Sequence, residues 1–297
     1  MIAGIVRGSL FSAALVAAGS AAAQDQPAAP ETQQIVVTGK RSIDREIRDF
    51  VGALAETPVQ RQLSRFEQSV CPTAIGLAPA QRGALIQRMR RVAEAAGIRV
   101  GEAKCSGNVV VVVTPDKRVF LKALREKKPE YFGDMSPSEI RKLLAQPGPA
   151  VAWQLRGQPL SARGTPIDVD PATGLLLNRT TEPASRLTPS ARPQFDAAVV
   201  IVETRAVTGL TTTEVADYAA MRAYAGMDPS RLGDSAAPTI LRVLEAPMGS
   251  AVPPSLTDWD LGYLRGLYQS PLNAYSGAQR AAIRREVARQ VQGADAK

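Results

Sequence analysis

Val109-Val110-Val111-Val112-Val113 is the clearest structural signal in the chain, since five consecutive β-branched residues predict a strand buried on both faces. Ala197 to Val202 is a second apolar run that predicts a buried strand, and Ala150 to Leu155 reads as a third. Helical patterns lie before, between and after these runs. This alternation predicts an α+β fold in which helices pack on a small mixed sheet.

The predicted helices carry recognisable start and stop signals. One helix runs from Pro79 to Ala96 and ends at Gly97, the position for a left-handed cap. Ser136-Pro137-Ser138-Glu139 and Thr211-Thr212-Thr213-Glu214 have capping-box spacing, so each predicts the first turn of a helix. A basic helix from Ser276 to Val291 is expected near the end of the chain.

Composition excludes two common kinds of enzyme. The 297 residues contain no histidine. Zinc hydrolases usually need imidazole ligands, and serine or cysteine hydrolases usually need histidine as the general base. Mechanisms based on lysine, on a carboxylate pair or on the substrate itself remain open. We expect no cofactor and no bound metal.

The N-terminus predicts export. Arg7 precedes a short apolar stretch, and Ala21, Ala22 and Ala23 supply the small residues that signal peptidase requires, so residues 1–23 are predicted to be a cleaved signal peptide. The apolar stretch is too short for a membrane anchor, and no later span is predicted. Residues 24–42 are expected to form a disordered leader that holds a short extended run, because Pro, Ala and Gln dominate its first half.

The rest of the chain divides by composition. Residues 43–156 form an N-terminal α+β part, residues 157–193 a connection rich in Pro and Gly, and residues 194–297 a C-terminal part. One continuous domain and two packed lobes both fit this division.

Cys71 and Cys105 are the only cysteines, so only one intramolecular connectivity exists. A disulfide agrees with an oxidising compartment such as the periplasm or the exterior, and two free thiols are the alternative. A catalytic cysteine would lack its histidine.

The formal net charge of +8 is expected to form a solvated surface, and the alternative is an anionic partner such as lipid headgroups or cell wall. Nucleic acid is not expected, because aromatic residues for base stacking make up only 5% of the chain. Glu245, Asp258 and Asp260 are the carboxylates considered for an acid pair, and we expect them to be exposed helix caps.

The segment Leu256-Thr257-Asp258-Trp259-Asp260-Leu261-Gly262-Tyr263-Leu264-Arg265-Gly266-Leu267-Tyr268 resembles a helix of matrixin-type zinc peptidases, which belong to the metzincins. The resemblance covers residues 199–268 and implies a zincin-like C-terminal half. In that family an upstream helix carries the zinc ligands and the general base. Counting back from Gly226, those three positions are Ala219, Ala220 and Ala223. The resemblance therefore implies a peptidase scaffold that has lost its metal site.

The stretch Gln34-Ile35-Val36-Val37-Thr38-Gly39-Lys40-Arg41 resembles the energy-coupling box of TonB-dependent outer-membrane receptors. That resemblance implies that Ile35, Val36, Val37 and Thr38 add as a strand to a TonB-like partner. The chain is too short for the large barrel of such receptors. As a whole, the chain also resembles a family of exported Gram-negative bacterial proteins, which implies export and assigns no function.

These observations predict an exported, non-catalytic envelope protein that binds a protein or a cell-wall component. One alternative is a histidine-independent hydrolase that uses carboxylate or lysine chemistry on cell-wall or peptide substrates. The other alternative is a periplasmic protein that engages TonB through Ile35 to Thr38.

Overall fold

A computed structural model describes residues 32–55, 61–177, 185, 188–247 and 250–294. The predicted signal peptide and the leader residues 24–31 lie outside these ranges. The helices are α1 (Thr32–Leu54), α2 (Pro79–Ala95), α3 (Lys117–Lys127), α4 (Pro137–Ala145), α5 (Thr204–Val207), α6 (Thr212–Ala225), α7 (Asp258–Gln269) and α8 (Ser276–Ala294), with short 3-10 turns η1 (Pro129–Phe132), η2 (Pro229–Leu232) and η3 (Ile240–Arg242). The strands are β1 (Arg65–Phe66), β2 (Pro72–Ile75), β3 (Val109–Thr114), β4 (Ala150–Arg156), β5 (Leu160–Ser161), β6 (Asp168–Val169), β7 (Leu176–Leu177), β8 (Ala191–Arg192) and β9 (Gln194–Glu203).

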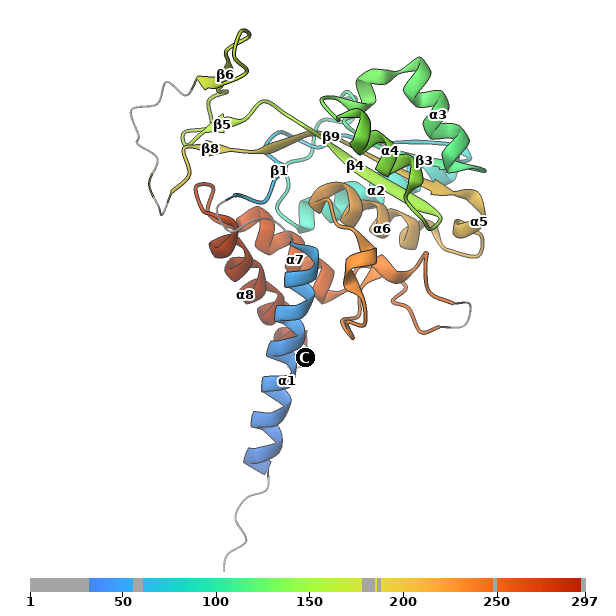
Figure 1. The fold of residues 1–297 in the computed structure, drawn as a ribbon. Helices are drawn as coiled ribbons and strands as arrows, with labels where there is room; N and C mark the ends of the chain where they lie inside the picture. The colour runs from blue at the N-terminus through green and yellow to red at the C-terminus, as the bar shows by residue number, and fades with distance from the viewer. Residues whose placement is uncertain (1–31, 56–60, 178–184, 186–187, 248–249, 295–297) are drawn as a thin grey trace, which may run out of the picture. The chain divides into compact units, whose positions relative to one another are not determined.

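The main sheet has five strands, and β9 lies inside it (Figure 1). One side of β9 pairs in parallel with β3 and, at its beginning, with β1, while β2 pairs in parallel with β3. The other side of β9 pairs antiparallel with β4. The predicted mixed sheet is therefore confirmed, and the two predicted buried strands are neighbours in it, with Val111 opposite Val200.

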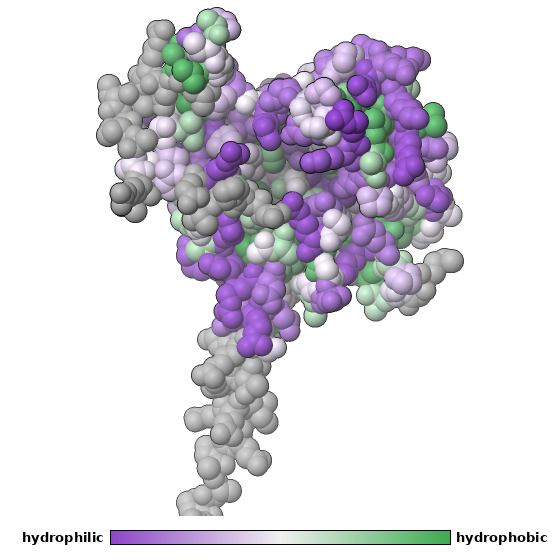
Figure 2. All heavy atoms as spheres, viewed as in Figure 1, coloured by the Kyte–Doolittle hydropathy of each residue, from purple (hydrophilic) through white to green (hydrophobic). Residues whose placement is uncertain are grey.

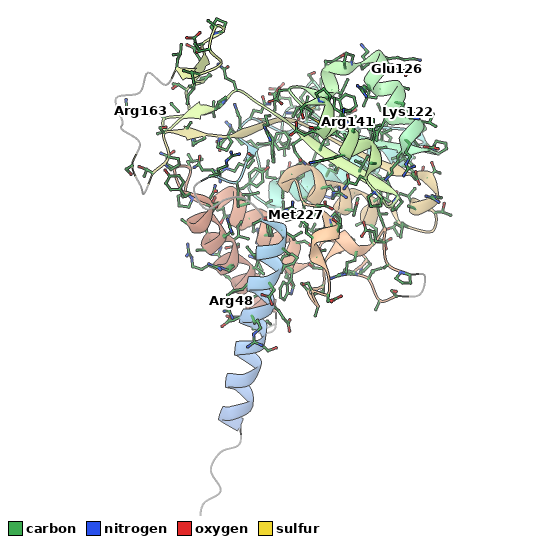
Figure 3. All side chains as sticks on the ribbon, viewed as in Figure 1. Arg48, Lys122, Glu126, Arg141, Arg163 and Met227 are labelled. Carbon is green, nitrogen blue, oxygen red and sulfur yellow. A yellow bond between two sulfur atoms is a disulfide. The ribbon has the colours of Figure 1, made fainter. Side chains whose placement is uncertain are left out.

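Helices cover both faces of this sheet. Because side chains alternate along a strand, Val109 and Val111 of β3 face one core and Val110 and Val112 face another. The first core holds α2 and α6 next to the sheet, with α7, α8 and the second half of α1 contributing further side chains. The second core is closed by α3, η1 and α4, the helices that carry Lys122, Glu126 and Arg141 in Figure 3.

The two halves of the sequence share one sheet. β9 from the C-terminal part lies between β3 and β4 from the N-terminal part, and residues 40–297 form one compact unit. The Pro- and Gly-rich connection adds two small antiparallel pairs, β5 with β8 and β6 with β7. Of the two arrangements left open by the sequence, a single continuous unit is the one observed.

The structure differs from the prediction over the leader. Residues 35–41, expected to be extended, lie inside helix α1. The later part of α1 places Ile43, Ile47, Phe50, Val51 and Leu54 at helical spacing, and these apolar residues pack in the first core. Starting a helix costs more free energy than adding residues to an existing one. Once the amphipathic part of α1 has formed, residues 35–41 can therefore continue it as helix.

Three helices begin with the same reciprocal cap. The Thr211 hydroxyl accepts a hydrogen bond from the backbone N–H of Glu214, and the Glu214 carboxylate accepts one from the backbone N–H of Thr211; this box opens α6. Ser136 and Glu139 form the same box at α4, and Thr257 and Asp260 form it at α7. The first two were predicted from their spacing, and both are confirmed.

Cys71 and Cys105 form a disulfide, as predicted, with Cα atoms 5.9 Å apart. The bridge joins the residue before β2 to the loop before β3. The carbonyl oxygen of Cys71 also accepts hydrogen bonds from the backbone N–H groups of Asn108 and Val109. The disulfide therefore reinforces the point at which the two neighbouring strands start to pair.

Candidate functional site

Among the described strands, β4 pairs only with β9, so its other side is a free edge of the main sheet. The N–H of Glu203 donates to the carbonyl of Pro149, which sets the alternation of the antiparallel ladder. It follows that the backbone groups of Ala150, Ala152 and Gln154 point away from β9. Among the described residues these outward groups have no hydrogen-bond partner.

A polar cavity of about 350 Å³ lies at the C-terminal end of β4. Polar side chains on its wall are Gln62, Ser64, Gln154, Arg156, Asp228 and Arg231. Gln62 is buried, and its Nε2 donates to the carbonyls of Leu272 and Ala274. Its Oε1 is also buried and has no partner among the described residues, so the cavity offers an acceptor to an incoming N–H group.

A larger cavity of about 810 Å³ lies at the N-terminal end of β4. Its walls come from α4, from the loop that leads into β4, and from α6 and η2; its charged residues are Glu139, Lys142, Arg222, Asp228 and Glu245. Asp228 lines both cavities, so the two are neighbours along the edge strand. Together they form what we call the β4 groove, lined by residues of the two cavities and the free edge between them.

Helix α6 positions the most unusual side chain of the groove. Arg222 is only 3% exposed, although it is one of the residues that line the larger cavity. Its Nη1 donates to the hydroxyl of Tyr218 over 2.5 Å, and its charge lies 5.6 Å from the centre of the Tyr218 ring. The helix end is held against the sheet, because Gln154 Nε2 donates to the carbonyl of Arg222 over 2.7 Å. Gly226 then ends α6 in the left-handed conformation, with φ of 64°.

Lys117 is the buried lysine that lysine chemistry would require, but its geometry is structural. Burial lowers the pKa of its ammonium group. However, Nζ donates to the carbonyls of Gln146, Pro147 and Gly148, which occupies all three of its N–H groups. The side chain therefore anchors the loop before β4 and presents no lone pair to a substrate.

The predicted degenerate site lies in the core. Ala219, Ala220 and Ala223 are all 0% exposed and belong to the first core. Their methyl groups leave no polar atom to hold a metal. Within the described ranges, no group of three or more His, Cys, Asp or Glu side chains could hold a metal ion. The zincin-like resemblance itself stays a prediction.

The three carboxylates considered as an acid pair lie in different surroundings. Glu245 and Asp258 are exposed, as expected, but Asp260 is fully buried, so the expectation of an exposed cap is wrong there. Asp260 accepts hydrogen bonds from the hydroxyl groups of Thr239 and Thr257 and from the backbone of Ile240 and Thr257. These hydrogen bonds stabilise the ionised carboxylate and lower its pKa, but burial disfavours the charge more strongly. The net effect raises the pKa of Asp260 to about 6.

The proposed TonB-binding residues Ile35, Val36, Val37 and Thr38 are helical in the structure. Pairing as a strand would require this part of α1 to unwind, so TonB engagement stays a prediction. Sequence reasoning missed Arg222 and the β4 edge. Arg222 lies one helical turn after Tyr218, on a helix whose other inward side chains are mostly apolar, and that contrast was the available signal.

Hydrophilic side chains dominate the visible surface over α3 and α4 (Figure 2). In the part of the chain that the structure describes, no helix has the length and apolar character needed to cross a membrane. Comparison of the chain with models of protein families, with curated proteins and with solved structures finds no match.

Proposed function

We propose that this chain is an exported, non-catalytic envelope protein that binds an extended segment of a partner protein along the β4 groove. The observation that carries the proposal is the free edge of β4, whose outward backbone groups at Ala150, Ala152 and Gln154 lack partners among the described residues. A free edge of this kind is a template for an added strand.

The groove supplies what strand addition needs. Main-chain hydrogen bonds to the edge give affinity that is independent of side chains, while neighbouring cavities give specificity by receiving alternate side chains. The two cavities lie toward opposite ends of β4 and offer polar contacts from Gln62, Arg156 and Arg222. An extended segment on the edge would meet both.

Export and loss of catalysis rest on separate support. The signal-peptide pattern of residues 1–23 and the single disulfide favour an oxidising compartment outside the cytoplasm. If the scaffold is peptidase-like, alanine at positions 219, 220 and 223 leaves no metal ligand and no general base there, which favours binding of a peptide without cleavage. The occupied ammonium group of Lys117 weighs against the lysine-based hydrolase.

Site-specific photo-crosslinking in intact cells tests this proposal. A photoreactive amino acid replaces Arg156, which is exposed at the groove, and in a second variant it replaces Lys122, an exposed control on α3 (Figure 3). We expect position 156 to give one dominant adduct with an envelope protein and position 122 to give none.

A matched pair of variants at the β4 edge shows whether the partner binds through the backbone of β4. Ala152→Pro removes an outward N–H group, which an edge strand tolerates, whereas Ala152→Val keeps that group. We expect the adduct to disappear in the proline variant and to persist in the valine variant, with both variants folded by circular dichroism. Identical adducts from positions 156 and 122, or an adduct insensitive to proline, would refute binding along β4.

A further inference from the structure

Arg222 is a buried cation whose hydrogen-bonding capacity is largely unused. Among the described residues, Nη1 of Arg222 donates to the hydroxyl of Tyr218, and the buried Nε has no partner. No described carboxylate forms an ion pair with it. Leaving a charged donor buried and unpaired costs free energy, so such a group usually marks a position for an anionic partner.

The surroundings restrict which anion fits. Asp228 and Glu245 line the same cavity, but Glu245 is exposed, and Asp228 accepts a hydrogen bond from the backbone of Ser230. Glu139, a third acid on the wall, is occupied by the cap of α4. These three negative charges oppose a polyanion such as phosphate, whereas a single carboxylate matches the planar, forked guanidinium.

We propose that Arg222 binds a carboxylate of the peptide that occupies the β4 groove, an inference that rests on the proposed function. The carboxylate is either the C-terminus of the partner or an Asp or Glu side chain. Its oxygens accept from the unused N–H groups of Arg222, while the adjacent main chain pairs with the outward groups of Ala150 and Ala152. Tyr218 holds the guanidinium in place through the hydrogen bond to its hydroxyl and the contact with its ring.

Nitrogen-15 NMR with three synthetic peptides tests the inference on the mature protein. The first is acetyl-Val-Thr-Val-Ala with a free C-terminus, the second is its C-terminal amide, and the third is acetyl-Val-Thr-Glu-Val amide. Two readouts are followed, the Nε–H signal of Arg222 and the backbone amide signals of β4. We expect the free acid to shift both and to bind about tenfold or more tightly than its amide.

The third peptide identifies the source of the carboxylate. Binding of the Glu-containing amide as tight as that of the free acid would assign a side-chain carboxylate, while preference for the free acid would assign the chain terminus. Arg222→Met should abolish the difference in affinity between the free acid and the amide. Arg222→Gln, which also removes the charge, serves the same comparison if the methionine variant does not fold. Lys142→Met removes a charge from the same cavity and should change the preference by no more than about twofold.

The two readouts separate this inference from the proposed function. If all three peptides shift the β4 amides with equal affinity, edge binding stands and the role of Arg222 is refuted. If the acid shifts Arg222 but leaves the β4 amides unmoved, the carboxylate site stands and strand addition is refuted. If no peptide shifts either signal at millimolar concentration, the carboxylate site is refuted, and the crosslinking experiment alone decides on the edge.

Discussion

Asp260 shows how one residue couples stability to pH. It is fully buried, and burial raises its pKa to about 6, above the value of about 3.9 expected in the unfolded chain. The folded protein therefore binds this proton more tightly than the unfolded chain. The contribution of Asp260 to stability is fully present below about pH 4 and is lost as the pH rises through about 6.

The expected loss of unfolding free energy across this window is roughly 3 kcal/mol, which follows from the difference between the folded and unfolded pKa values of Asp260. Denaturant unfolding between pH 4 and 7 should show the trend, and Asp260→Asn, which cannot titrate, should flatten it. The exposed Asp258 provides the control, because Asp258→Asn should leave the pH dependence nearly unchanged. A carboxyl carbon signal of Asp260 that titrates near pH 4 would contradict the raised pKa.

The position of Asp260 at the third residue of its helix could be predicted, but its burial could not. The capping role follows from local spacing to Thr257. Burial depends on Thr239 and Ile240, which lie about twenty residues earlier in the chain and reach Asp260 only after folding. For Arg222 the helix pattern indicated only its place one turn after Tyr218 on a largely apolar helix, and its contact with the cavity beside β4 depends on residues far away in the sequence.

Among the elements, α7 and α8 pack closely because α7 carries two glycines one turn apart. A Cβ atom built on Gly262 would lie 2.7 Å from the Cα atom of Val287, and one built on Gly266 would lie 2.5 Å from the Cα atom of Ile283. Those contacts are with backbone, which cannot move aside without separating the helices. The buried side chains of Ile283 and Val287 depend on this approach.

Gly266→Ala is therefore expected to destabilise the protein by about 1–2 kcal/mol, even though alanine favours a helix by about 1 kcal/mol over glycine. Thermal unfolding followed by circular dichroism measures the change. Gly83 lies in α2 with no atom near its virtual Cβ, so Gly83→Ala should instead raise the stability by about 1 kcal/mol. Stabilisation by both substitutions would show that the close packing of α7 on α8 is not required.

Over the whole molecule, the sequence predicted the central strands well and their arrangement poorly. The valine run and the run from Ala197 to Val202 were identifiable because strands buried on both faces need nearly continuous apolar residues. Nothing local could indicate that β9 would insert between β3 and β4, or that β4 would run antiparallel and leave an edge free. Pairing order depends on contacts between residues far apart in sequence, which periodicity does not report.

The disulfide contributes to the stability of the whole fold. Cys71 and Cys105 are 34 residues apart, and closing a loop of this length restricts the unfolded chain by about 3–4 kcal/mol. The Cys71→Ser, Cys105→Ser double variant should lose about that much stability, and a reductant should lower the stability of the natural protein to the same level while leaving the variant unchanged. Because both comparisons remove the same bridge, unequal losses would mean that serine disturbs packing as well. If the reductant has no effect on the natural protein, the bridge adds little stability, and it would no longer support an oxidising compartment as the protein's working environment.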